Sequence, residues 1–163
     1  MQLTASYDYS APPGRVARLF ADRGFQLEAA QAAGAESAQV EVTDGPDGAF
    51  TVAARATSPA TALPAQVRGL LPAGLEIRQA QVWGQPGPDG ARQASLAGEI
   101  VGAPIQLTGR LALAPAARGS RFSFCGQVKA QLPLLGPAIE QAAAPAIEGF
   151  WAALHRVAER WLA

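Results

Sequence analysis

The chain has 163 residues, the usual size of one domain, so we expect a single domain over residues 1–163. Its 13 basic and 13 acidic residues leave no net charge, which argues against nucleic acid as a partner and against a polybasic membrane patch. Cys125 is the only cysteine, which excludes an internal disulfide and favours a reducing compartment.

The chain opens with a predicted strand followed by two short helices. Apolar side chains take every second position of the strand, at Leu3, Ala5, Tyr7 and Tyr9. Val16, Leu19 and Phe20 then share one helical face, and Asp22-Arg-Gly ends this helix. A second helix is predicted from Phe25 to Ala33, where Gly34 stops it.

From Ala38 onward the period changes to two, and turn residues recur at hairpin spacing. The turns are predicted at Asp44–Gly48, Gly87–Gly90 and near Ala117–Gly119. They delimit six strands, so the first strand completes a set of seven. Only the stretch from Thr57 to Gly74 interrupts the pattern, and we expect a helical turn within it, between Ala65 and Leu71.

The last segment predicts a long helix that opens at Gly136-Pro137. Its apolar residues recur at steps of three or four, at Ile139, Ala143, Ile147, Phe150, Leu154, Val157 and Trp161. Pro145 lies inside this run, so we expect a bend or an interrupted turn there. Phe150, Trp151 and Trp161 are expected to dock the helix.

An antiparallel sheet with one apolar face and a single long helix to cover it must curl around that helix. Gly98, Gly109 and Gly126 fall in phase with the apolar strand residues, where a missing side chain favours curvature. The same phase turns Leu96, Leu107, Phe122, Phe124 and Val128 inward. It turns Ser95, Thr108, Arg110, Ser123, Cys125 and Lys129 outward. The predicted fold class is α+β, with a seven-stranded curved antiparallel sheet around one C-terminal helix.

This order of elements resembles the START-like (SRPBCC) superfamily of polyketide cyclases, pollen-allergen lipid binders and coenzyme Q carriers. Tyr9-Ser-Ala-Pro looks like the opening of many bacterial members. Leu63-Pro-Ala-Gln-Val, Gln81-Val-Trp83 and Leu132-Pro-Leu-Leu-Gly136 look like an uncharacterised actinobacterial branch. The resemblance implies a helix-grip fold with a cavity between sheet and helix.

The leading hypothesis for function is binding, transport or sensing of a hydrophobic small molecule of lipid, polyketide or quinone type in that cavity. The residues expected to line it are Tyr9, Gln79, Gln81, Trp83, Leu96, Leu107, Phe122, Phe124, Ile147, Phe150, Trp151 and Leu154. In strand phase, the amides of Gln79 and Gln81 face an apolar interior, unless a bulge turns both outward and puts Ala80 and Val82 inside. The aromatic residues stack on a ligand in one interpretation and form plain core in the other.

Two other functions stay open. A cyclase or dehydratase would need an acid or base in the cavity, which Tyr9 could supply; a protein interaction module would use the polar outer sheet face. His155 is the only histidine, expected at the surface, so no metal constellation and no cofactor are predicted. The start lacks the features of a signal peptide and no apolar stretch reaches membrane-spanning length, so we expect a cytoplasmic protein without an integral membrane segment.

Overall fold

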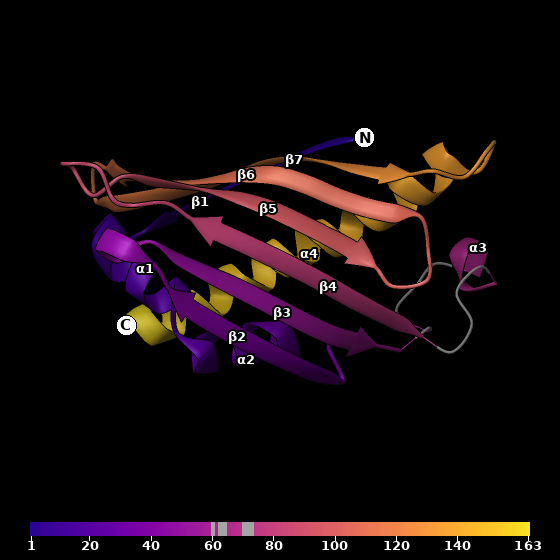
Figure 1. Cartoon of the computed structure of the whole chain (residues 1–163), viewed down its shortest axis with the longest axis horizontal. Helices are drawn as coiled ribbons and strands as arrows, with labels where there is room; N and C mark the ends of the chain where they lie inside the picture. The colour runs from indigo at the N-terminus through magenta and orange to yellow at the C-terminus, as the bar shows by residue number, and fades with distance from the viewer. Residues whose placement is uncertain (60, 62–64, 70–73) are drawn as a thin grey trace.

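The computed structural model describes residues 1–59, 61, 65–69 and 74–163 (Figure 1). The strands are β1 (Gln2–Tyr9), β2 (Ser37–Asp44), β3 (Phe50–Ser58), β4 (Leu75–Trp83), β5 (Arg92–Ile100), β6 (Ile105–Ala116) and β7 (Gly119–Ala130). The helices are α1 (Pro13–Phe20), α2 (Arg23–Ala32), the single turn α3 (Ala65–Arg68) and α4 (Gly136–Leu162), with a 3-10 turn η1 (Pro46–Gly48). The α+β fold predicted from the sequence is confirmed.

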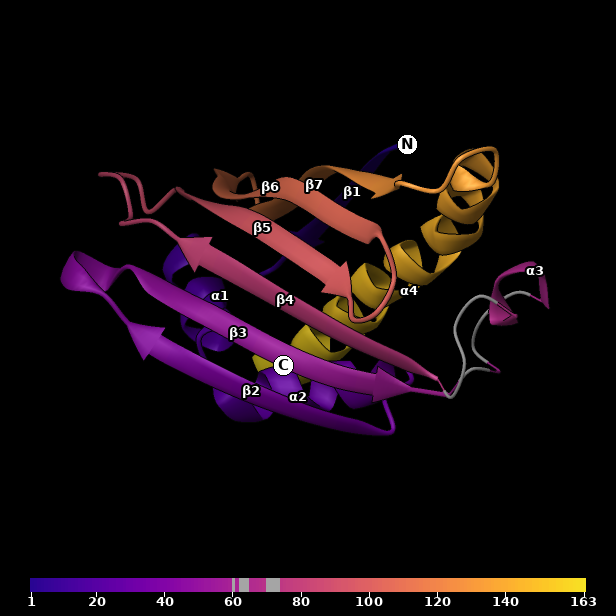
Figure 2. The same cartoon turned by 45° about the vertical axis from the view of Figure 1, so that its right-hand side comes forward.

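The seven strands form one antiparallel sheet in the order β1-β7-β6-β5-β4-β3-β2. Strands β2 to β7 follow one another as neighbours, whereas β1 returns to pair with β7, with Leu3 opposite Gly126. The sheet curves, and α4 crosses its concave side diagonally (Figures 1 and 2). Helices α1 and α2 lie at the C-terminal end of α4, and α3 lies at the opposite end of the molecule.

The predicted turns hold with small shifts at their ends. The first hairpin closes through η1, where Asp47 has a left-handed backbone (φ 55°) and Gly48 follows at φ 88°. Helix α2 begins two residues earlier than predicted, because the Asp22 side chain accepts a hydrogen bond from the backbone N–H of Phe25 and caps it. Helix α3 lies within the predicted helical turn, whose end at Leu71 falls outside the described residues.

Inner and outer faces alternate along the strands as the sequence phase predicts. On β7 the side chains of Phe122, Phe124 and Val128 are buried, and Cys125 between them is exposed. The inner faces of the strands, together with α1, α2 and α4, enclose one large apolar core. The burial of these side chains is the main stabilising contribution to the fold.

Two of the in-phase glycines stand directly opposite each other, Gly109 on β6 and Gly126 on β7. A Cβ added at Gly126 would lie 2.6 Å from the Phe124 ring and 2.6 Å from the Thr108 carbonyl oxygen. A Cβ at Gly109 would lie 2.8 Å from the same ring. Only glycine therefore fits beneath Phe124, which lets that ring lie flat against the sheet.

Helix α4 runs without interruption from Gly136 to Leu162, so of the two alternatives expected at Pro145, a bend or an interrupted turn, the interrupted turn is not there. A proline removes the hydrogen bond to the carbonyl four residues earlier, which here belongs to the exposed Gln141 and can face solvent.

Trp151 is buried as predicted, but Trp161 is 43% exposed and lies against α2, where its Nε1 donates to the carboxylate of Glu28.

Candidate functional site

A cavity of about 540 Å³ lies between the sheet and the N-terminal half of α4. The sheet contributes residues from β4, β5, β6 and β7, and the helix contributes residues from Ile139 to Trp151. The cavity is partly open to solvent, and its wall is largely apolar. The wall residues are Leu75, Ile77, Gln79, Leu96, Gly98, Glu99, Ile100, Ile105, Gln106, Leu107, Val128, Ile139, Ala142, Ala143, Pro145, Ala146, Ile147, Phe150 and Trp151.

Small side chains explain why the core is hollow at this end. The helix presents Ala142, Ala143 and Ala146 to the cavity, and the strand facing it has Gly98. A Cβ at Gly98 would make only ordinary contacts, the nearest at 3.6 Å, so the glycine leaves space that neighbouring groups do not fill. The interior is therefore short of side-chain volume beside Gly98.

At the other end of α4 the interior is filled by aromatic rings. Phe20 stacks on Phe25 with ring centroids 6.0 Å apart, and it meets Trp83 at 5.8 Å and Phe122 at 5.7 Å. Trp151 closes the boundary between the two halves, with its ring 5.0 Å from Phe124. These contacts have the spacing at which aromatic pairs attract. The molecule thus has a packed aromatic end and a hollow end.

Six of the residues predicted to line a cavity do so. They are Gln79, Leu96, Leu107, Ile147, Phe150 and Trp151. The other six do not border this cavity: Tyr9, Gln81, Trp83, Phe122, Phe124 and Leu154 are buried in the core beyond it. For the aromatic residues among them, the plain-core interpretation describes their position, because ring-to-ring packing leaves no room between them.

Both glutamines of β4 face inward, and the strand has no bulge. Its pairing with β3 is continuous from Leu75 to Trp83, so Gln79 and Gln81 share one face. Gln81 is 3% exposed, and its Oε1 accepts a hydrogen bond from Trp83 Nε1 at 3.1 Å. The Gln79 amide is half-buried on the cavity wall and has no hydrogen-bond partner among the described residues. Only Gln79 therefore offers a polar group to the cavity from this strand.

The wall carries little charge. Glu99 is its one charged residue within the described ranges, and Glu99 and Gln106 stand opposite each other on β5 and β6, both exposed. The same two residues, with Gln79, Gly98 and Leu107, also border a shallower hollow of about 380 Å³ that includes Arg78 and Thr108. The amide and carboxylate groups of the wall thus come from the sheet, while the helix side has the indole of Trp151, whose Nε1 is buried without a hydrogen-bond partner among the described residues.

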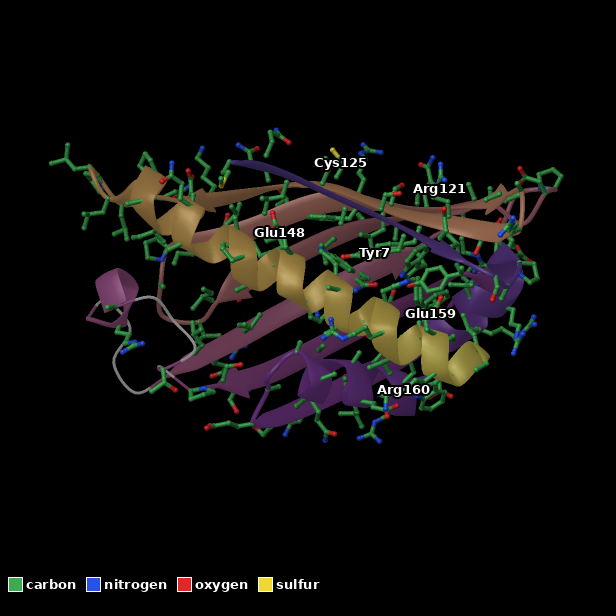
Figure 3. All side chains as sticks on the ribbon, turned by 180° about the vertical axis from the view of Figure 1, so that it is seen from behind. Tyr7, Arg121, Cys125, Glu148, Glu159 and Arg160 are labelled. Carbon is green, nitrogen blue, oxygen red and sulfur yellow. The ribbon has the colours of Figure 1, made fainter. Side chains whose placement is uncertain are left out.

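The sequence led us to expect the single histidine at the surface, but the structure places it partly inside the protein. His155 is half-buried, stacks on Tyr7 with ring centroids 4.7 Å apart, and lies 5.0 Å from the Tyr9 ring. Its Nε2 is 3.9 Å from Glu159 of the same helix, and its Nδ1 has no partner in the described part of the chain. Figure 3 shows Tyr7 and Glu159 beside the C-terminal half of α4.

Tyr9 belongs to this cluster and not to the cavity. It is 2% exposed, and its hydroxyl is buried with no hydrogen-bond partner among the described residues. Burial raises the pKa of the Tyr9 hydroxyl well above its ordinary value, with smaller contributions from Glu159 and Tyr7. Tyr9 therefore stays protonated at physiological pH and sits where the cavity does not reach.

The outer face carries isolated polar contacts. Arg121 on β7 pairs with Asp8 on β1 at 2.7 Å, and this hydrogen bond holds the pKa of the Asp8 carboxyl below its usual range. Arg121 and Cys125 project from the side of the sheet that faces away from α4 (Figure 3). Within the described residues, no group of three His, Cys, Asp or Glu side chains could hold a metal ion, and no helix has the length and apolar character to cross a membrane.

A curved antiparallel sheet around one long C-terminal helix, with a cavity between them, is the helix-grip fold of START-like proteins. Solved structures of this class match the chain over nearly its whole length. The chain belongs to the family described as Protein of unknown function (DUF2505), which matches residues 4–162. The resemblance to the START-like superfamily drawn from the sequence is confirmed.

Uncharacterized proteins of Mycobacterium bovis and Mycobacterium tuberculosis are 32% identical to this chain over 108 residues. The match covers 65% of this chain and 62% of each relative, so the chain spans less than two thirds of the length of these relatives. Their names assign no activity.

Three solved structures have a fold similar to that of this chain. A protein of Thermus thermophilus is 16% identical with a TM-score of 0.63, covering 97% of both chains. A START superfamily protein of Mycobacterium smegmatis is 14% identical with a TM-score of 0.57, covering 98% of both. The di-domain ARO/CYC StfQ of the steffimycin biosynthetic pathway is 10% identical with a TM-score of 0.62, covering 98% of this chain and 50% of that one. At these identities the likeness establishes the fold alone.

Proposed function

We propose that this protein binds a hydrophobic small molecule, of lipid, polyketide or quinone type, in the cavity between α4 and strands β4 to β7, and that it acts as a carrier or sensor. The observation that carries the proposal is the cavity itself: about 540 Å³ of space with a wall that is apolar except at Gln79, Glu99 and Gln106. Small-molecule sites have about 300 to 1,000 Å³ and the same mixture of apolar wall and few polar groups.

The energetics favour occupancy by an apolar ligand. Wall atoms that face empty space forgo the dispersion contacts that a packed core would give them. A ligand that fills the space restores those contacts and removes apolar surface from water, at about 25 cal/mol per Å². The packed aromatic end holds α4 against the sheet through contacts that do not involve a ligand.

The direct test is to recover the occupant. We expect native mass spectrometry of the protein, purified from its own host under non-denaturing conditions, to show a retained apolar compound. An environment-sensitive dye such as Nile red should bind the extracted protein with one-site stoichiometry. Protein that carries nothing from its host and binds no apolar dye would end the proposal.

A pair of substitutions on one strand, β5, locates the binding. Gly98→Leu places a side chain into the cavity, where the glycine now leaves space, and should abolish dye binding. Ser95→Leu adds similar bulk on the exposed face of the same strand, at a residue that borders neither hollow, and should leave dye binding unchanged. Equal loss in both variants would show that the dye binds elsewhere.

The rival functions have less support. General acid–base catalysis needs a titratable group in the cavity, and Glu99, exposed at its edge, is the one such side chain on the described wall. The outer sheet face exposes few large apolar side chains among the described residues. Val82 is the one such side chain in a strand that is more than half exposed.

We further propose a cytoplasmic location, since the only cysteine, Cys125, is a free thiol on an exposed site.

A further inference from the structure

We propose that the ligand of this cavity is electrically neutral: an apolar molecule whose single uncharged polar group, such as a hydroxyl, ester or ketone, pairs with the Gln79 amide. This inference rests on the proposed function and adds the chemical class of the ligand. It excludes ionised fatty acids and phospholipids as the ligand held inside.

The charge of the wall disfavours an anionic ligand. The described wall residues include no lysine, arginine or histidine, and the one charged residue among them, Glu99, is exposed on the outer phase of β5, opposite Arg78. The residues outside the described ranges, 60, 62–64 and 70–73, are alanine, leucine and proline in the sequence and add no cation. An anionic headgroup in this cavity would lose its hydration without gaining a counter-charge from the wall.

The position of Gln79 makes its amide available to a ligand. Its β5 partner across the ladder is Gly98, and the next residue along that row, Leu107 on β6, also lines the cavity. No side chain at Gly98 covers the amide on that side, and no hydrogen bond to a described residue engages it. The amide therefore keeps one acceptor oxygen and two donor hydrogens for a group that enters the cavity.

Gln81 shows how an amide buried on this face is paired within the protein. Gln81, two residues along the same strand, lies in the filled part of the core and is paired with Trp83. Gln79 lies where the interior is hollow and lacks such a partner among the described residues. A ligand hydroxyl could donate to Gln79 Oε1, as the indole donates to Gln81, and an ester or ketone oxygen could accept from the Gln79 NH₂ group.

The volume limits the size of the ligand. At about 30 Å³ per heavy atom, the share of one molecule in liquid water, the cavity holds roughly 18 heavy atoms. Dodecanol, methyl laurate and laurate fall within this limit. They share one hydrocarbon chain and differ in the polar end, so their comparison isolates the effect of charge.

The experiment is displacement of Nile red from the protein by each of these three compounds at mildly alkaline pH, where laurate is ionised. We expect dodecanol and methyl laurate to displace the dye at concentrations at least about tenfold lower than laurate. Laurate that competes as well as the neutral compounds would overturn the inference and leave the proposed function standing. A protein that binds neither the dye nor any of the three would overturn both.

Variants at Gln79 test the polar contact itself. Gln79→Leu should weaken dodecanol binding by about fivefold relative to a pure hydrocarbon competitor such as dodecane. Gln79→Lys supplies the missing cation and should tighten laurate binding by about tenfold. Gln93→Leu and Gln93→Lys, on the exposed outer face of β5, are the matched controls and should change neither value.

Circular dichroism and thermal unfolding establish that each variant is folded. If Gln79→Lys does not fold, the comparison of dodecanol with dodecane in Gln79→Leu still decides whether the amide contacts the ligand. Unchanged selectivity in a folded Gln79→Leu protein would contradict the pairing proposed here.

Discussion

The indole Nε1 of Trp83 donates a hydrogen bond to Oε1 of Gln81 at 3.1 Å, with both side chains buried and only two residues apart on β4. Residues i and i+2 of a strand lie on the same face, so this bond runs along the inner surface of the sheet. It satisfies the one polar atom of Trp83 in a region otherwise filled by apolar rings. Gln81 is thus a structural residue of the core.

Removing the Gln81 amide should therefore destabilise the protein. In Gln81→Leu the Trp83 N–H stays buried without an acceptor, and we expect the free energy of unfolding to fall by about 1 to 3 kcal/mol. Urea denaturation followed by tryptophan fluorescence measures this change. Gln93→Leu on the exposed side of β5 is the control and should alter stability by less than about 0.5 kcal/mol. Equal stabilities for the two variants would show that the bond contributes nothing.

Alanine should destabilise the protein much more at Gly126, one of the paired glycines of β6 and β7, than at Gly98 on β5. Gly126→Ala would place a methyl group 2.6 Å from the Phe124 ring and from the Thr108 carbonyl oxygen, so it should cost about 2 to 3 kcal/mol through displaced neighbours. Gly98→Ala meets nothing closer than 3.6 Å and should be near neutral. Thermal unfolding of both variants checks the order, and a larger cost at Gly98 would contradict this account of the sheet.

Truncations along α4 should report where the interior is hollow. Leu154 is 3% exposed in the packed region, so Leu154→Ala should cost about 2 to 5 kcal/mol, because it opens a new void. Ile147 already borders the cavity, so Ile147→Ala enlarges an existing space and should cost only about 1 kcal/mol. Chemical denaturation of the two ligand-free variants gives both numbers. A larger cost for Ile147→Ala than for Leu154→Ala would contradict a hollow interior beside the N-terminal half of α4.

Tyr9 predicts a loss of stability at alkaline pH. Its pKa is raised in the folded state, chiefly by burial, while in the unfolded chain it ionises near its ordinary value of about 10. Above that pH the unfolded state binds fewer protons than the folded state, so the free energy of unfolding falls as pH rises. Below it, both states keep the proton and Tyr9 adds no pH dependence.

Tyr9→Phe should remove this part of the alkaline slope. Because the Tyr9 hydroxyl has no hydrogen-bond partner among the described residues, the variant should match or slightly exceed the native protein at neutral pH. Urea unfolding at neutral pH and near pH 11 separates the two effects. A slope that persists unchanged in Tyr9→Phe would assign it to other groups.

Local pattern was sufficient to predict most of the fold. Alternation along the strands, turn residues at hairpin spacing and the apolar stripe of the last helix each reflect a rule that acts over a few residues, and they agree with one another. Pro145 does not interrupt α4, because the carbonyl that it frees belongs to the exposed Gln141, and the sequence pattern does not report that exposure. His155 was misjudged because its burial depends on β1, far away in sequence.

The site was predicted only in part, because phase fixes which face a residue takes but not whether space remains beside it. Leu107 and Phe122 both point inward, yet one borders the cavity and the other is locked among rings. The difference arises from the volumes that meet across the sheet–helix gap, alanines and Gly98 at one end and aromatic rings at the other. The sizes of the residues along the inner face of α4, considered together with their apolar period, would therefore help to predict where the interior is hollow.

The pairing of β1 with β7 also governs how the chain can assemble. Leu3 meets Gly126, about 120 residues later, so the first strand has no neighbour in the sheet until the last hairpin exists. During synthesis the opening segment must wait, with its apolar side chains uncovered, while the ribosome completes nearly everything else. Closure of this edge is then a late event, and it must overcome the entropy of the longest loop that any strand pair of the sheet closes.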